Sequence, residues 1–506
     1  MLKNSLKIST FALIMSFINF AFFHIPFFKF VCNNVDCKSL NGLLIVACLV
    51  IIMLVANYFV LHLIFSISRR FGKGLLIALF LVSSVAIYFV NTYGIILDET
   101  MIGNVLNTKY SEASGFFSFK LILYLIIFGI LPSAYIYIAK IERETLKRFS
   151  INSSLSLLTI IILVFANAGN WLWIDKHSKT LGGLAMPWSY TVNICRFYIH
   201  KHQSNEKEIL LPNATITNNK KAVVVLVIGE SARRANFSLY GYQKQTNPLL
   251  SKVKNLYCFK ANSSATYTTA GVKSILDHKE TGDLYEVLPN YLYRNHVEVA
   301  WRTSNWGEPP LHIKNYQTRD SLMRLCKGEG CHFDEILLAG LKEQILASSS
   351  SKTFIVLHTS TSHGPQYSKR YPPKFETFKP VCNSVELSQC SHQELINAYD
   401  NTIVYTDYIL DSVIETLKQL QGYDCAMIYV SDHGESLGEK NLYTHGVPIS
   451  IAPKEQYEIP FIVWTSNGKM KPKPNDLLTQ YNVFHSVLKF LSIKSPIYNE
   501  KMNIFK

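Results

Sequence analysis

Five long apolar stretches in the first third of the chain limit what it can fold into. They lie at about residues 10–31, 43–66, 74–97, 119–139 and 155–173. A membrane-spanning helix needs roughly 20 mostly apolar residues, and each stretch supplies that length. A signal peptide is the alternative for the first stretch, but no small-residue cleavage site follows it and four more stretches come after it. The sequence therefore predicts a transmembrane domain of five helices over residues 1–173.

Lysine and arginine residues between the spans predict how the chain is oriented in the membrane. Clusters precede the first span and lie between spans two and three and between spans four and five: Lys3 and Lys7; Arg69, Arg70 and Lys73; Lys140, Arg143, Lys147 and Arg148. Because cytoplasmic loops carry an excess of basic residues, the amino terminus is expected in the cytoplasm. Five spans then place everything after about residue 174 outside it.

The cysteines agree with that placement. Three pairs lie close together in the sequence: Cys32 with Cys37, Cys326 with Cys331, and Cys382 with Cys390. In an oxidising compartment the last two predict short disulfides, and the first pair is a candidate for a third. A metal clip is the alternative for "CKGEGC", but no second half follows at zinc-finger spacing.

The formal net charge of +14 indicates a partner that is nucleic acid, a membrane surface or an anionic ligand. The sequence shows no pattern of aromatic and basic residues typical of a nucleic-acid module. We therefore expect a membrane and anionic ligands, and no nucleic acid.

The outer part of the chain has the pattern of an α/β domain. A connector and linker over 174–220 precedes it, and from 221 to 506 short apolar runs recur: "AVVVLVI", "HVEVAW", "TFIVLH", "CAMIYV" and "PFIVW". Continuous apolar runs are typical of strands covered on both faces. A helix is predicted over 392–420, where Ser391 and Glu394 have capping-box spacing. The alternation of strands and helices favours a largely parallel central sheet.

Two of these runs end on acidic residues. The first is followed by Gly229 and Glu230, and "CAMIYVS" is followed by Asp432 and His433, while "TFIVLH" ends on His358. Ligands gather beyond the carboxyl ends of parallel strands, so these side chains are expected to share one crevice. Carboxylates and imidazoles are zinc ligands.

Two more histidines strengthen the prediction of a metal site. A single "DHG" is also typical of an ordinary turn, but His363 in "STSHGP" and His445 in "YTHGVP" add further ligand types. An ordinary surface histidine remains the alternative for each of these two. Glu435 is interpreted as a loop acid near the site.

Hydroxyl groups for nucleophilic attack lie in "ANSSATYTTAGVKSIL", just before a predicted helix. A metal next to an alcohol lowers the pKa of that alcohol, and a helix amino terminus favours an anionic phosphate. Spacing alone does not rank Thr266, Thr268 and Thr269, and helix caps are their alternative role.

Several longer motifs resemble those of the phosphoethanolamine transferases of Gram-negative inner membranes, the family that includes colistin-resistance enzymes. The motifs are "VIGESARRANFSLYGY", "LHTSTSHGPQYSKRYP", "AYDNTIVYTD", "SDHGESLGE" and "THGVPISIAP". The resemblance runs over nearly the whole chain. It implies a multi-pass inner-membrane protein with five spans and a periplasmic catalytic domain similar to alkaline phosphatases and sulfatases.

The resemblance also implies roles for individual residues. It implies a zinc ion held by Glu230, Asp432, His433 and the nucleophile, which best matches Thr266. His363 and His445 correspond to histidines that handle substrate or hold a second, weaker metal ion, and His358 matches a further histidine. The sequence departs from the family at the nucleophile loop, where relatives have flanking cysteines and an "SVP" run in place of "TTAGVK".

One polar segment of the membrane half also carries a prediction. Asn104, Thr108 and Glu112 are spaced four residues apart and would share one face of a helix. A solvated helix face is the alternative. The resemblance implies that this face binds the donor head group, with Glu112 suited to its ammonium.

The implied reaction is phosphoethanolamine transfer from phosphatidylethanolamine through a covalent enzyme intermediate. Lipid A is the expected acceptor, and core sugars, other glycans and proteins are alternatives that no motif separates. The new amine would lower the negative charge of the cell surface and promote resistance to cationic peptides such as polymyxin. We expect a monomer.

Two other functions remain as alternatives. One is a phosphoglycerol transferase of the lipoteichoic-acid-synthase type, and the other is a non-catalytic membrane-anchored binding protein. A sulfatase is disfavoured because no cysteine lies in a "CxPxR" setting.

Overall fold

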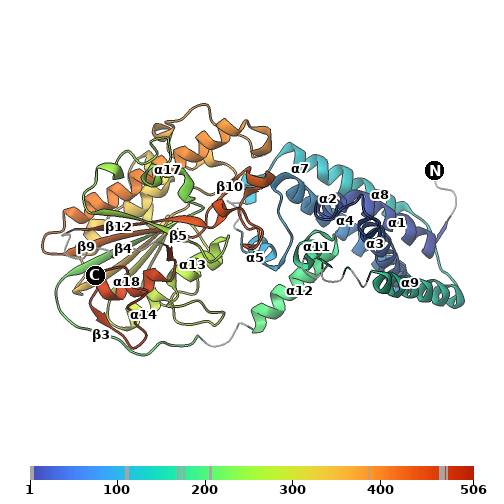
Figure 1. Cartoon of the computed structure of the whole chain (residues 1–506), viewed down its shortest axis with the longest axis horizontal. Coiled ribbons are helices and arrows are strands. Elements are labelled where there is room, and N and C mark those ends of the chain that lie inside the picture. Colours follow the sequence, from blue (N-terminus) through green and yellow to red (C-terminus); the bar gives the residue numbers. More distant parts are fainter. Residues whose placement is uncertain are drawn as a thin grey trace. The chain divides into compact units, whose positions relative to one another are not determined.

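The structure is a computed structural model. It describes residues 5–108, 113–167, 170, 173–174, 177–203, 208–385, 387–466, 473 and 477–506. The chain forms two compact units (Figure 1), the first over residues 1–106 and 117–200 and the second over residues 107–116 and 201–506. Each is described separately.

The first unit consists of helices. Their bounds are α1 (Ile8–Phe23), α2 (Ile25–Asn34), α3 (Leu40–Ile67), α4 (Arg69–Tyr93), α5 (Glu99–Asn107), α7 (Phe119–Tyr124), α8 (Leu131–Ile138), α9 (Leu146–Ala166), α11 (Ser178–Leu184) and α12 (Trp188–Gln203). Among the described residues, α3, α4, α9 and the continuous helix Phe119–Ile138 are long and apolar enough to cross a membrane. The pair α1 and α2 makes a fifth span if it is counted as one, so the predicted helical membrane domain is confirmed.

The first predicted span is broken rather than straight. The axes of α1 and α2 differ by 63°, and Pro26 lies in the first turn of α2. Proline lacks an amide proton and its ring clashes with the carbonyl group four residues earlier, which explains the bend. Cys32, in α2, and Cys37, just after it, are not disulfide-bonded, so the third disulfide is absent.

The second unit is built on an eight-stranded sheet with the order β13-β5-β12-β9-β4-β8-β6-β7. The strands are β4 (Ala222–Gly229), β5 (Leu256–Asn262), β6 (Glu298–Thr303), β7 (Asn315–Thr318), β8 (Lys352–His358), β9 (Asp424–Ser431), β12 (Glu458–Thr465) and β13 (Leu478–Thr479). Every neighbouring pair is parallel except the two that involve β12. The predicted largely parallel sheet is therefore confirmed.

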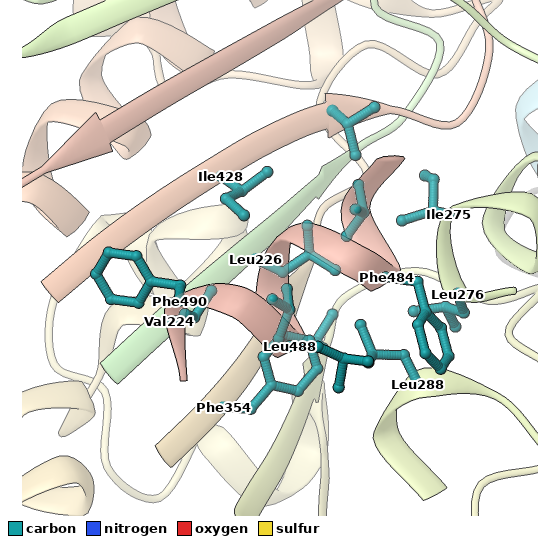
Figure 2. Close-up of a cluster of buried hydrophobic side chains, with 14 of the residues drawn as sticks. Val224, Leu226, Ile275, Leu276, Leu288, Phe354, Ile428, Phe484, Leu488 and Phe490 are labelled. Atoms are coloured by element: carbon teal, nitrogen blue, oxygen red, sulfur yellow. The ribbon is translucent and has the colours of Figure 1, made fainter. Parts of the chain in front are cut away.

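Both faces of the sheet are covered by helices, as the continuous apolar runs predict. Along β4, Val224, Leu226 and Ile228 pack into one core and Val223 and Val225 into the other. The first core includes side chains of α13 (Thr268–Leu276), α14 (Leu288–Arg294) and α18 (Asn482–Phe490), and the second includes side chains of α16 (Leu341–Leu346) and α17 (His392–Lys418). Figure 2 shows Leu226 and Ile428 of the sheet packed with Phe484 and Leu488 of α18.

Local signals in this unit also match the structure. Ser391 and Glu394 form the predicted capping box at the start of α17. The disulfides Cys326–Cys331 and Cys382–Cys390 are both present. Short two-stranded ribbons complete both units. In the first unit β1 (Leu6–Lys7) pairs with β2 (Ile141–Glu142); in the second, β3 (Thr215–Ile216) pairs with β14 (Ile493–Lys494) and β10 (Ser436–Leu437) with β11 (Tyr443–Thr444).

Candidate active site

The acidic residues predicted from the strand ends meet at one edge of the sheet. Strands β4 and β9 are parallel neighbours, with Gly229 opposite Ser431. The next residues, Glu230 and Asp432, therefore leave the sheet side by side, and both are buried. Ser231 then adopts a left-handed backbone conformation (φ 53°), which turns the chain sharply away from the strand direction. Strain of this kind is often found at functional sites.

Four side-chain groups converge beyond these strands. The Nε2 atom of His433 lies 3.4 Å from Glu230 Oε1 and 3.4 Å from Asp432 Oδ2. The hydroxyl oxygen of Thr268 lies 3.3 Å from Glu230 Oε2 and 3.3 Å from His433 Nε2. The Nδ1 atom of His433 lies 2.8 Å from the carbonyl oxygen of Gly434. If Nδ1 carries the proton and donates it there, the lone pair of Nε2 faces the carboxylates.

The buried groups of this cluster shift one another's pKa values. Burial and the charge of Glu230 raise the pKa of Asp432 well above its usual value. Burial would lower the pKa of His433, but Asp432 and Glu230 raise it to about 10. Burial opposes ionisation of Glu230, yet His433 holds its pKa well below the usual value.

These groups fit a zinc ion. Two carboxylates, an imidazole and a hydroxyl are a four-ligand set of the kind zinc binds. The Oδ2 atom of Asp432 is buried and has no hydrogen-bond partner, which is the state expected of an oxygen that binds a cation. Among the described residues, Glu230, His433 and His445 also have ligand atoms within 4.8 Å of one another.

Thr266 and Thr268 occupy different places. Thr268 is the first residue of α13, and its hydroxyl lies in the cluster. The hydroxyl of Thr266 instead donates to the carbonyl oxygen of Val447, and its own carbonyl accepts from Gly446. Thr266 thus anchors the loop that carries His445, and the structure brings Thr268, not Thr266, to the predicted ligands.

Gly271 explains how α13 comes so close to the acidic residues. A Cβ atom at this position would lie 2.2 Å from the carbonyl oxygen of Asp432. Glycine in "TTAGVK" therefore lets the first turn of α13 pack against the end of β9 and places Thr268 beside Glu230.

His363 and His445 line one side of the same site. The ring of His445 lies 4.2 Å from that of His433 and 5.4 Å from that of His363, measured between centroids. Burial and the charge of His433 lower the pKa of His445. The predicted association of these histidines with the cluster agrees with this geometry.

His358 lies behind the site rather than in it. It is buried at the end of β8, with Nδ1 3.7 Å from Glu308 Oε2 and 3.4 Å from the hydroxyl of Thr303. Thr303 also donates to the carbonyl oxygen of Asn305, whose side chain donates a 2.7 Å hydrogen bond to Glu230 Oε2.

Asn305 is a site residue that the sequence reasoning missed. It is the second residue after the strand β6, whereas Glu230 and Asp432 are the first residues after β4 and β9. The strand-end rule that selected those two acids would have found Asn305 if it had been applied to amides as well.

The long motifs support the site from α17. Tyr399 donates to the carbonyl oxygen of Ser231 and accepts from the amide of Arg233, at 2.7 and 2.9 Å. Asn236 donates to the buried carboxylate of Asp400. These contacts fix the strained turn after Glu230 and explain why "AYDN" accompanies "GESARRAN".

The predicted membrane-side residues are only partly described. Asn104 lies in α5, but the helix ends at Asn107, one residue before Thr108. The spacing predicted that Asn104 and Thr108 share one face of a helix, but Thr108 lies just outside α5. Glu112 lies outside the described residues.

Comparison with known proteins identifies the family. The sulfatase family model matches residues 222–493, and the model for phosphoethanolamine transferases EptA and EptB matches residues 53–202. The phosphoethanolamine transferase EptA of Helicobacter pylori is 40% identical over 98% of this chain and 96% of its own length. The chain belongs to the phosphoethanolamine transferase family.

Other members of this transferase family agree in sequence and in structure. EptA of Escherichia coli K12 is 30% identical over 100% of this chain and 97% of its own length. The integral membrane lipooligosaccharide phosphoethanolamine transferase A of Neisseria meningitidis matches with a TM-score of 0.89, 25% identity and 99% coverage of both chains. This phosphoethanolamine transferase is thus an enzyme with an apolar helical amino-terminal domain and a sulfatase-like catalytic domain.

Proposed function

We propose that the enzyme moves phosphoethanolamine from phosphatidylethanolamine to lipid A, through a covalent intermediate on Thr268. The observation that carries this proposal is the position of the Thr268 hydroxyl, 3.3 Å from both Glu230 Oε2 and His433 Nε2. The match of residues 53–202 to EptA and EptB supports phosphatidylethanolamine rather than phosphatidylglycerol as the donor. A binding protein without catalysis would not need this buried cluster.

Thr268 replaces Thr266 in the proposed mechanism for a geometric reason. A nucleophile must reach both its activating groups and the phosphorus atom. The Thr266 hydroxyl donates a 2.6 Å hydrogen bond to the carbonyl oxygen of Val447. Thr268 instead lies at the amino terminus of α13, where backbone amides favour a phosphate group.

Zinc is the proposed cofactor, held by Glu230, Asp432 and His433. When bound, it would lower the pKa of the nearby hydroxyl and offset the negative charge of the phosphate. Asn305 keeps one oxygen of Glu230 oriented. A second, weaker metal ion at His363 and His445 remains the alternative role for these two histidines.

The proposed reaction has two steps. In the first, the Thr268 oxygen bonds to phosphorus, the bond to the glycerol oxygen breaks, and diacylglycerol leaves with a proton. In the second, an acceptor hydroxyl or phosphate attacks phosphorus, and the bond to Thr268 breaks. His363 or His445 carries the proton.

Membrane attachment fits these substrates. We propose that the catalytic domain lies in the periplasm beside the outer leaflet of the inner membrane, and that a monomer is active. Asn104, Thr108 and Glu112 are the proposed binding residues for the donor head group. The product carries a new amine, which reduces surface negative charge and the attraction of cationic peptides such as polymyxin.

Mass analysis of lipid A from cells with and without the gene tests this function. We expect a mass increase of one phosphoethanolamine group that depends on Thr268. In a parallel reaction with purified enzyme, labelled phosphatidylethanolamine should release diacylglycerol, and labelled phosphatidylglycerol should not. Release from phosphatidylglycerol alone would contradict the proposed donor, and unmodified lipid A with a modified glycan or protein would contradict the acceptor.

A further inference from the structure

A short hairpin places a buried acid opposite His445. Strands β10 and β11 pair antiparallel, with Ser436 opposite Thr444. Glu435 immediately precedes the first strand and His445 immediately follows the second, so the register brings these two residues face to face. The side chain of Gln456 also joins the two strands, because its amide nitrogen donates to the hydroxyl of Ser436 and to the carbonyl oxygen of Thr444.

The two side chains are joined by a short hydrogen bond. The Nδ1 atom of His445 lies 2.7 Å from Glu435 Oε2. The hydroxyl of Ser231 is farther from Nδ1, at 3.3 Å, and donates to Glu230 at 2.7 Å. Glu435 is therefore the main acceptor for a proton on Nδ1.

Glu435 is also held by hydrogen bonds that do not involve His445. The side chain of Glu435 is fully buried, and its Oε1 atom accepts a hydrogen bond from the hydroxyl of Tyr367. Its amide donates to the carbonyl oxygen of Glu455 at 2.9 Å. A carboxylate held at both oxygens fixes the orientation of the imidazole that it contacts.

The opposite edge of the imidazole is open. The side chain of His445 is 16% exposed, and among the described residues its Nε2 atom has no hydrogen-bond partner. Since a neutral imidazole carries one proton, a proton on Nδ1 leaves the lone pair on Nε2.

We propose that Glu435 is a positioning residue, which holds the Nδ1 proton of His445 so that Nε2 can accept the proton of the attacking acceptor hydroxyl. The inference rests on the proposed two-step transfer and decides between His363 and His445 as the proton carrier. As the acceptor oxygen bonds to phosphorus, its proton moves to Nε2. The Thr268 oxygen leaves with the electron pair of the broken bond and recovers a proton from the imidazolium.

A double-mutant cycle on the full-length enzyme tests this role. Diacylglycerol release from fluorescent phosphatidylethanolamine is measured in lipid micelles with lipid A as acceptor. We expect Glu435→Ala and His445→Ala each to lower kcat by about 10²-fold, the scale of general-base catalysis. KM should stay within about threefold, and the double variant should be no slower than His445→Ala.

Two conservative variants separate positioning from a merely structural effect. Glu435→Gln keeps an oxygen that accepts from Nδ1, so kcat should stay within about tenfold of the wild type. Tyr367→Phe frees Glu435 Oε1 without touching His445, so it should reduce kcat less than Glu435→Ala does, and this reduction should be absent in the His445→Ala background.

Other outcomes would overturn the inference. If Glu435→Ala slowed the wild type and the His445→Ala enzyme by the same factor, Glu435 would not act through His445. If Glu435→Ala does not fold, Glu435→Gln takes its place. The reduction in kcat that Glu435→Gln causes in the wild type must then disappear in the His445→Ala background. A folded wild type that released no diacylglycerol would instead contradict the proposed donor.

Discussion

At the scale of single residues, the hydroxyl of Thr268 lies in the cluster of Glu230 and His433, whereas the hydroxyl of Thr266, two residues earlier, does not. We expect Thr268→Ala to reduce turnover of labelled phosphatidylethanolamine by at least about 10³-fold, because it removes the nucleophile. Thr266→Ala is the matched control. It removes one hydrogen bond, worth about 1 kcal/mol of folding stability, and should keep most of the activity. Equal losses in both variants would contradict the assignment.

The proposed metal ligands give a second residue-scale prediction. Asp432→Asn keeps the shape of the side chain but removes the charge that a buried cation requires, so zinc affinity should fall by more than about 100-fold. Metal content of the purified protein after dialysis against a chelator measures this effect. Asp407→Asn, at a buried acid outside the cluster, serves as the control and should retain zinc. Full zinc content in Asp432→Asn would contradict the ligand set.

The sequence predicted that Glu230 and Asp432 lie together because both directly follow strands that are expected to be parallel. Glu230 and Asp432 follow long apolar runs, and their positions depend only on β4 and β9 being parallel neighbours. Thr266 and Thr268 could not be ranked in this way. The side-chain directions in this loop depend on Val447, which is distant in sequence, and on the close approach of Gly271 to Asp432.

At the scale of secondary-structure elements, the packing of α13 is the most sensitive feature. A methyl group at Gly271 would lie 2.2 Å from the carbonyl oxygen of Asp432. Gly271→Ala should therefore push α13 away from β9, lower stability by about 1–3 kcal/mol and reduce kcat. Gly282→Ala is the matched control because nothing lies within 4 Å of its Cβ position. Thermal unfolding and turnover are compared, and similar behaviour of the two variants would contradict the packing argument.

The cap of α17 should affect stability without affecting chemistry. Ser391→Ala removes the side-chain acceptor of the capping box and should cost about 1 kcal/mol. The site contacts from α17 begin at Tyr399, two turns later, so kcat and KM should be unchanged. Denaturant unfolding together with steady-state kinetics checks both parts, and a loss of kcat in a fully folded Ser391→Ala enzyme would contradict the separation.

The elements that the sequence predicted are those with a strong local signal. The central strands β4, β8 and β9 are continuous apolar runs, because they are covered on both faces. β5 and β7 were not predicted. Their residues are mostly half-buried or exposed, so the apolar pattern is weak. The break at His24 was not predicted although Pro26 signals it, because the span was assigned from the length of its apolar run.

At the scale of the whole molecule, the account requires the two ends of the chain to lie on opposite sides of the membrane. Alkaline phosphatase fused after Lys506 should be active, because that enzyme needs an oxidising compartment for its disulfides. Green fluorescent protein fused at the same place should stay dark. Fusions at Ser68, between α3 and α4, should give the reverse result, since the first turns of α4 carry Arg69, Arg70 and Lys73. A fluorescent carboxyl-terminal fusion would contradict the orientation.

Peptide mapping of the enzyme after incubation with phosphatidylethanolamine, without acceptor, tests the central claim most directly. The account predicts a mass increase of one phosphoethanolamine group on the peptide that contains Thr268, localised to that residue by fragmentation. The adduct should persist in Thr266→Ala and be absent from Thr268→Ala. An adduct on Thr266, or an unchanged adduct in Thr268→Ala, would contradict the account.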